Sequence, residues 1–186
     1  MAARERDLLS VLIDDHREIQ DLLELLQVAT EAQERRWLST ELIIEMVRHS
    51  FAEQMYLYPL VRQALPDGDA IVDQEIAEEA EVEKLLRWLE RAEASSPQFS
   101  ALATMLTSKV QRHIENEETA VFPRLADHVS PTELVKAGDR VTWAKAKART
   151  RQRLARTDPD LHRLLAPGAG LVKRVRHLLT GRWARG

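Results

Sequence analysis

Apolar residues recur at the 3.6-residue period of an amphipathic helix along most of the first 130 residues. This pattern predicts four long helices, at about residues 5–28, 38–64, 71–93 and 98–128. Almost no segment shows the strict alternation of a half-buried strand. Turn signals separate the helices, among them Pro66 to Asp69 and the Ser96-Pro97 pair, which suits a helix start. The chain is therefore predicted to be all-α, as an up-down-up-down four-helix bundle.

The apolar pattern weakens in the last third of the chain. A further helix is predicted to begin near Pro131 and to run into a stretch rich in Lys and Arg. A loop at Pro167–Gly170 and a short amphipathic helix from Leu171 should follow. We therefore divide the chain into a bundle, residues 1–130, and a helical C-terminal extension, residues 131–186.

The net charge of −3 conceals a strong asymmetry between these two parts. Residues 1–130 hold 13 basic and 26 acidic residues, whereas residues 131–186 hold 14 basic and 4 acidic residues. A basic extension can bind nucleic acid or a membrane surface. We favour docking on the acidic bundle of the same chain or of a second copy in a homo-oligomer, because the opposite charge is already there. No helix-turn-helix or zinc module is recognisable, so a nucleic-acid partner is not expected.

Composition narrows the chemistry further. The 186 residues include no cysteine, which excludes disulfides, iron-sulfur clusters, thiolate zinc sites and a cysteine nucleophile. Any metal would be held by His, carboxylate or Tyr side chains. The N-terminus is too charged for a signal peptide, and no apolar run approaches the ~18 residues that span a bilayer. The sequence thus predicts a cytoplasmic protein without a membrane partner.

An internal repeat carries the residues with metal-binding chemistry. The motif His-x3-Glu-x4-aromatic-Pro occurs at His49–Pro59 and again, 64 residues later, at His113–Pro123. The helices that precede the two motifs also align in sequence, and in this alignment His16 corresponds to Glu79. Residues i and i+4 share a helix face, so each motif presents a ring nitrogen beside a carboxylate. Two such helices facing inward can hold two metal ions with bridging carboxylates.

Three further residues join the two motifs as candidates. His16 interrupts one apolar stripe, and Glu79 interrupts another, formed by Val72, Ile76, Val82 and Leu86. An unpaired charge is costly in such a stripe, and a metal ion would compensate it. Glu79 could instead belong to a solvated acidic face, because four other glutamates lie close to it in the sequence. Tyr56 follows His49 by seven residues on the same helix face, and its phenol could bind the metal or lie beside it. We predict Tyr56 as a catalytic residue.

At these residues the sequence resembles the hemerythrin-like, or HHE cation-binding, proteins over about residues 8–128. The resemblance implies a four-helix bundle around a non-haem diiron centre. It implies as iron ligands His16, His49, Glu53, His113 and Glu117. The family's next histidine falls at position 79, where this chain has Glu. The order His-x3-Glu differs from the Glu-x-x-His motif of ferritin-like proteins.

The donor set leads to a functional hypothesis. Carboxylates and a phenolate stabilise ferric iron, so we expect a diferric, oxo-bridged resting centre. Such a centre suits peroxide or nitric oxide chemistry better than oxygen delivery. The leading hypothesis is a catalase-like or peroxidase-like oxidoreductase that consumes hydrogen peroxide in oxidative or nitrosative stress, with nitric oxide as a candidate co-substrate. The alternative is a protein that binds or senses dioxygen, nitric oxide or iron without turnover.

Overall fold

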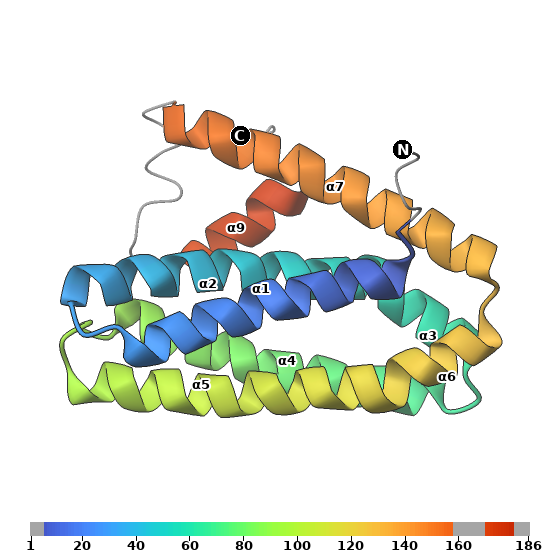
Figure 1. Cartoon of the computed structure of the whole chain (residues 1–186), viewed down its shortest axis with the longest axis horizontal. Coiled ribbons are helices and arrows are strands. Elements are labelled where there is room, and N and C mark those ends of the chain that lie inside the picture. The colour runs from blue at the N-terminus through green and yellow to red at the C-terminus, as the bar shows by residue number, and fades with distance from the viewer. Residues whose placement is uncertain (1–5, 158–169, 181–186) are drawn as a thin grey trace.

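The computed structural model describes residues 6–157 and 170–180 (Figure 1), and every regular element in these ranges is helical. The prediction of an all-α protein is confirmed. The α-helices are α1 (Leu8–Val28), α2 (Ala32–Ala52), α3 (Tyr58–Ala64), α4 (Gly68–Arg91), α5 (Pro97–Asn116), α6 (Phe122–His128), α7 (Pro131–Thr157) and α9 (Leu171–Thr180). Two π-helical turns, η1 (Glu53–Leu57) and η2 (Glu117–Val121), join α2 to α3 and α5 to α6.

Four helical rods form the bundle: α1, α2 with α3, α4, and α5 with α6. Helix α1 packs against α2 and α5, and α4 packs against the same two helices. Successive rods run in opposite directions in Figure 1. Side-chain caps begin two of the rods, because Asp7 accepts a hydrogen bond from the Ser10 amide at 2.8 Å and Ser96 accepts one from the Phe99 amide at 3.2 Å.

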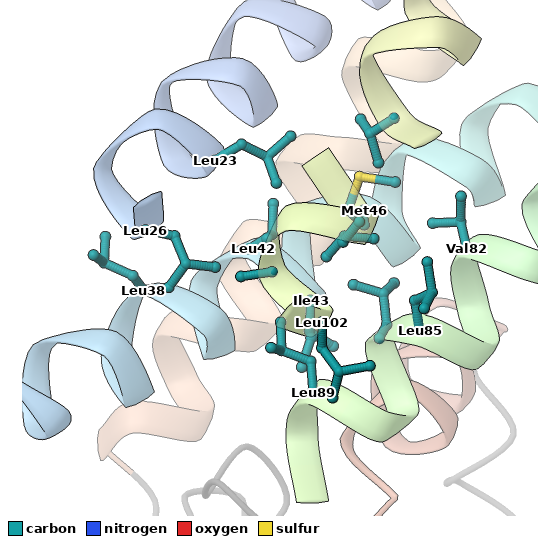
Figure 2. Packing of buried hydrophobic residues seen from close by; sticks show 14 of the residues in the cluster. Leu23, Leu26, Leu38, Leu42, Ile43, Met46, Val82, Leu85, Leu89 and Leu102 are labelled. Atoms are coloured by element: carbon teal, nitrogen blue, oxygen red, sulfur yellow. The ribbon is translucent and has the colours of Figure 1, made fainter. Parts of the chain in front are cut away.

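Two apolar clusters fill the bundle at opposite ends of the rods. Figure 2 shows the first cluster, in which side chains from several rods, such as Leu23, Leu42 and Leu89, meet. The second cluster lies toward α3 and α6 and includes Leu12 and Leu125. The histidines and glutamates of the internal repeat fall between the two clusters in every rod. We call this band the polar layer; it consists of His16, His49, Glu53, Glu75, Glu79, His113 and Glu117.

The C-terminal helices pack onto the bundle. Helix α7 contacts α1, and a Cβ atom at Gly138 would overlap the carbonyl oxygen of Arg6, so glycine permits the close crossing. Helix α9 contacts α2 and α4 and adds Leu171 and Val175 to the first apolar cluster. Helix α7 begins at Pro131, where the sequence predicted a helix start. The division into residues 1–130 and 131–186 remains a prediction.

Opposite charges meet where the extension touches the bundle. Lys145 of α7 pairs with Asp15 of α1, and Arg176 of α9 lies 2.8 Å from Glu83 of α4. These contacts agree with docking on the acidic bundle of the same chain; a homo-oligomer stays a prediction. Most of the expected Pro167–Gly170 loop lies outside the described residues. No helix in the described parts of the chain has the length and apolar character to cross a membrane.

Candidate metal centre

The two motifs have the same local structure. In each half, the motif Glu begins a π-helical turn, and the aromatic residue donates its amide N–H to the carbonyl of that Glu, as in Tyr58 to Glu53 and Phe122 to Glu117. The following prolines, Pro59 and Pro123, lack an N–H and crowd the carbonyl four residues back. A wider turn relieves this conflict, and such turns are frequent at functional sites.

The first group of candidate ligands comes from three rods. His16, His49, Glu53 and Glu117 are buried and present one ligand atom each within 4.8 Å of one another. The Nε2 atom of His49 lies 2.8 Å from Glu53 Oε1, and the Nε2 atom of His16 lies 3.2 Å from Glu117 Oε2. Both carboxylates have no exposed surface. The helix face predicted from the i, i+4 spacing therefore points inward.

A second group shares one residue with the first. Glu75, His113 and Glu117 also offer ligand atoms within 4.8 Å of one another. The Nε2 atom of His113 lies 3.7 Å from Glu53 Oε1 and 3.8 Å from Glu117 Oε2. Glu53 and Glu117 thus stand between His49 and His113, where carboxylates could bridge two metal ions.

The hydrogen bonding of the polar layer tests whether a metal fits there. Several of its buried atoms make no hydrogen bond: both carboxylate oxygens of Glu53 and of Glu117, and the Nε2 atoms of His16 and His49. The close approach of His49 Nε2 to Glu53 Oε1 is a charge contact without hydrogen-bond geometry. Buried carboxylates without partners are costly, and a cation removes that cost. Imidazole nitrogens with carboxylate oxygens suit iron, manganese or zinc. The residues present therefore fit a metal site with two positions.

Each histidine also has a carboxylate on its other ring nitrogen. The distances from Nδ1 to the carboxylate oxygen are 2.8 Å for His16 and Glu118, 2.9 Å for His113 and Glu75, and 3.6 Å for His49 and Asp15. The first of these contacts is a hydrogen bond, and the other two are charge contacts. Histidines that bind metals usually have a carboxylate partner of this kind, which orients the ring. Sequence reasoning did not identify Asp15, Glu75 or Glu118. Asp15 and Glu118 each adjoin a predicted ligand, but their contacts cross between helices and leave no spacing signal.

The structure distinguishes two glutamates on α4. Glu75 is buried in the polar layer, whereas Ile76, which the predicted apolar stripe included, is 44% exposed. Positions 72, 75, 79 and 82 follow the alternating three- and four-residue steps of one helix face, so residues 75 and 79 both point inward. Glu79 accepts hydrogen bonds from the Tyr58 hydroxyl at 2.5 Å and from the Gln54 amide. Burial and the nearby charge of Glu53 raise the pKa of Glu79 to about 7.

The phenol that reaches a carboxylate of this layer belongs to Tyr58. In the π-helical turn, the residue one turn beyond Glu53 is Tyr58 rather than Tyr56. Tyr56 is half-buried and packs against the second apolar cluster. Burial and the charge of Glu53 raise the pKa of Tyr58, so its hydroxyl stays a donor to Glu79. The predicted role of Tyr56 as ligand or catalytic residue stays a prediction.

Without a metal ion, the charges of the layer are balanced by protons. Burial disfavours the ionised form of Glu53, but His49 and His113 outweigh it and lower its pKa. Burial also disfavours protonated His49, yet the charge of Glu53 raises its pKa to about 10. Burial and the charge of Glu53 raise the pKa of Glu117. A metal ion binding here must displace these protons, so its affinity should increase with pH.

Comparison with known proteins agrees with this geometry. Residues 7–125 match the family model described as Hemerythrin HHE cation binding domain. The chain belongs to this family. The resemblance found in the sequence is thereby confirmed, and family membership makes the polar layer of this HHE domain its candidate cation site.

Three known proteins are similar to this chain. A DNA nickase from Nostoc sp. is 25% identical over 149 residues, which cover 80% of this chain and 42% of that protein. An uncharacterized hemerythrin-like protein from Schizosaccharomyces pombe is 24% identical over 123 residues, which cover 66% of this chain and 61% of the relative. The chain thus spans less than two thirds of either protein. An HHE cation binding domain-containing protein from Mycobacterium kansasii has a crystal structure with the same fold, at a TM-score of 0.72 and 21% identity over 91% of this chain and 99% of that chain.

Proposed function

We propose that the polar layer holds two iron ions and that the protein breaks down hydrogen peroxide. Support for two ions comes from the ring nitrogens of His16 and His49 on one side and of His113 on the other, with the carboxylates of Glu53 and Glu117 between them. The mixed imidazole and carboxylate donors are compatible with iron, the description of the HHE family specifies a cation, and the hemerythrin-like resemblance of the motifs favours iron. When bound, a pair of iron ions would supply the redox equivalents for converting two peroxide molecules into one dioxygen and two waters.

The carboxylates of α4 favour peroxide chemistry over oxygen carriage. Glu75 and Glu79 lie on the side of the layer that holds His113 and Glu53. Anionic oxygen donors near the metal stabilise the ferric state, whereas reversible oxygen binding needs a ferrous state that survives in air. The carboxylate of Glu79, at the position where the family has a histidine, is the observation that carries the proposal.

Glu79 is suited to move a proton of the substrate. Its pKa of about 7 lets the carboxyl group both donate and accept a proton near neutral pH. The hydroxyl of Tyr58 holds one carboxylate oxygen in place at 2.5 Å. A pocket of about 150 Å³ between α2, α4 and α9 includes Glu79 and Gln54 in its lining and has room for a small oxidant. Peroxide would reach Glu79 through this pocket.

Oxygen evolution by the iron-loaded protein tests the proposal. One dioxygen should appear for two molecules of peroxide consumed, and Glu79→Gln should lower the rate about 10-fold or more because it removes the proton-carrying group. Glu81→Gln is the matched control, because Glu81 is exposed and pairs with Lys84 at 2.6 Å. A protein that consumes no more peroxide than free iron ions, yet binds dioxygen or nitric oxide when reduced, would support the alternative of a binding or sensing protein.

We also propose that the chain acts in the cytoplasm without a nucleic-acid or membrane partner, and that any homo-oligomer forms through its basic extension. The similarity to a DNA nickase makes nucleic acid the first alternative to test. Nicking of supercoiled plasmid by the purified protein, or salt-sensitive binding to duplex DNA, would contradict this part of the proposal.

A further inference from the structure

The carboxylates behind the three histidines are themselves held by donors. Glu118 accepts a hydrogen bond from Arg17 at 2.7 Å, Glu75 accepts one from Asn116 at 2.7 Å, and Asp15 accepts one from Lys145. Arg17 directly follows His16, and Asn116 lies three residues after His113. Lys145 differs, because it lies on α7 and is 130 residues from Asp15 along the chain.

The surroundings of Asp15 explain why it depends on Lys145. Asp15 is 8% exposed and lies against a groove of about 340 Å³ between α1 and α7. Asp14 and Glu18 also line this groove, and their carboxylates cannot donate to another carboxylate. Arg6 lines it too, but its guanidinium pairs with Asp14 at 3.0 Å. The ammonium of Lys145 therefore compensates the buried charge of Asp15.

We propose that Lys145 is a positioning residue of the metal centre. Lys145 holds one oxygen of Asp15, and the other oxygen faces the Nδ1 atom of His49 at 3.6 Å. These two atoms are not hydrogen-bonded at this distance, so Asp15 acts on the ring through its charge. That charge favours a proton on Nδ1 and leaves Nε2 directed toward Glu53 and the centre. Without the ammonium, Asp15 would turn toward the groove and the ring of His49 would lose its orientation. The C-terminal extension would thus complete a site that the sequence placed wholly in the bundle.

The inference rests on the proposed metal binding, and zinc alone tests it without peroxide chemistry. Wild type, Lys145→Gln, Lys145→Arg and Arg140→Gln are loaded with Zn²⁺, and metal transfer to a chelator is timed. Loss of an outer partner weakens metal binding about 10-fold to 100-fold, so Lys145→Gln should release one zinc ion about 10-fold faster. Lys145→Arg should restore most of the retention. Arg140→Gln, which removes a charge from an exposed position of α7, should match wild type.

A second readout reports on His49 itself. Spectra of the zinc-loaded, ¹⁵N-histidine-labelled protein show which ring nitrogen of His49 carries a proton, and His49→Gln assigns the signal. The signal of the Nδ1 proton should broaden or shift in Lys145→Gln and stay unchanged in Arg140→Gln. If wild type takes up no metal, the proposed function fails. In that case a shift of the His49 Nδ1 proton signal in metal-free Lys145→Gln supports the positioning role, and an unchanged signal overturns it.

Combining substitutions separates positioning from a general loss of stability. Asp15→Asn removes the charge that Lys145 compensates, so adding Lys145→Gln to it should cause no further loss of zinc. This double variant also serves if Lys145→Gln alone fails to fold. Additive effects in the double variant, or a Lys145→Gln protein with unchanged zinc release and unchanged His49 signals, would overturn the inference.

Discussion

The two halves of the bundle, α1 to α3 and α4 to α6, share a frame and differ in what they place on it. Both carry His-x3-Glu at the junction with a π-helical turn. At the aligned positions of the first helices, the first half has His16 and the second has Glu79. The His16 ring stacks on Phe122 with centroids 5.8 Å apart, while Glu79 accepts a hydrogen bond from Tyr58. The aromatic residue of the motif in each half thus contacts the first helix of the other half.

This exchange shows how partner chemistry follows donor chemistry. The imidazole of His16 uses Nδ1 for Glu118 and Nε2 for the polar layer, so the face of its ring needs only an apolar neighbour such as Phe122. Glu79 is a carboxylate that needs donors, and Tyr58 supplies one at the equivalent place. The change from His16 in the first half to Glu79 in the second therefore goes together with a change of its aromatic partner from Phe122 to Tyr58.

The symmetry ends at the outer carboxylates. Glu75, which faces His113, aligns with Leu12 in the first half, and Leu12 is packed in the second apolar cluster. The partner of His49 is Asp15, which depends on Lys145 from outside the repeat. The repeat thus specifies the inward donors, and each half has acquired its outer partners separately.

Removing a carboxylate that serves both halves should have the largest effect. Glu117 belongs to both groups of ligand atoms, so Glu117→Gln should reduce the metal content from about two ions per chain to fewer than one. Elemental analysis of the reconstituted protein measures this. Glu115→Gln is the control on an exposed position of the same rod. Retention of two ions by Glu117→Gln would show that Glu117 is not shared.

Substitutions confined to the second half should affect one metal position. Glu75→Ala removes the carboxylate 2.9 Å from His113 Nδ1, and about 10-fold to 100-fold faster loss of one ion is expected. Glu79→Ala should loosen the same ion less, because Glu79 is held by Tyr58 and Gln54. Chelator competition measures both variants against Glu81→Ala. Equal retention in all three proteins would remove α4 from the metal site.

Sequence periodicity predicted the features that depend on local helix geometry. The four rods and the inward face of His49 and Glu53 follow from the 3.6-residue period and i, i+4 spacing. Capping preferences predicted the helix start at Ser96 and Pro97. The distribution of charge predicted a basic extension attracted to an acidic bundle. These features need no knowledge of which helix lies next to which.

The remaining features depend on the path of the backbone and on contacts between helices. A π-helical turn shifts the helix phase, so the phenol that faces Glu79 is Tyr58 although regular spacing favoured Tyr56. The predicted apolar stripe of the third helix included Ile76, which is exposed in the structure. The stripe therefore missed the neighbouring residue Glu75, which is buried. The contact of Lys145 with Asp15 joins segments that lie 130 residues apart, so the spacing of residues within one helix could not reveal it.

Making the two halves alike at their aromatic residues should have a moderate effect. Tyr58→Phe gives the first half the residue that the second half has at Phe122 and leaves Glu79 without its hydroxyl donor. We expect a shifted visible spectrum of the iron-loaded protein and a several-fold change in peroxide turnover. Tyr56→Phe is the matched control and tests the sequence prediction directly. A phenolate-to-iron absorption band lost only in Tyr56→Phe would confirm the predicted role of Tyr56 as a ligand.

The smallest effect concerns the pH dependence of the metal-free protein, where two histidines of the first half behave oppositely. The pKa of His49 is raised to about 10, because the charge of Glu53 outweighs burial. As the pH rises, the unfolded chain therefore loses this proton at a lower pH than the folded chain does. The stabilisation from His49 is complete below pH 6.5 and is lost as the pH rises toward 10. Burial and the charge of His49 lower the pKa of His16 to about 4, so stability also falls as the pH drops from 6.5 to 4. The thermal unfolding temperature of the metal-free protein should therefore be highest near pH 6.5.

Variants of the two histidines test this prediction. His49→Gln should flatten the decline on the alkaline side, and His16→Gln the decline on the acid side. A metal-loaded protein should lose the alkaline decline because metal ions replace the protons. An alkaline decline that survives in His49→Gln would assign it to His113, whose pKa is also raised.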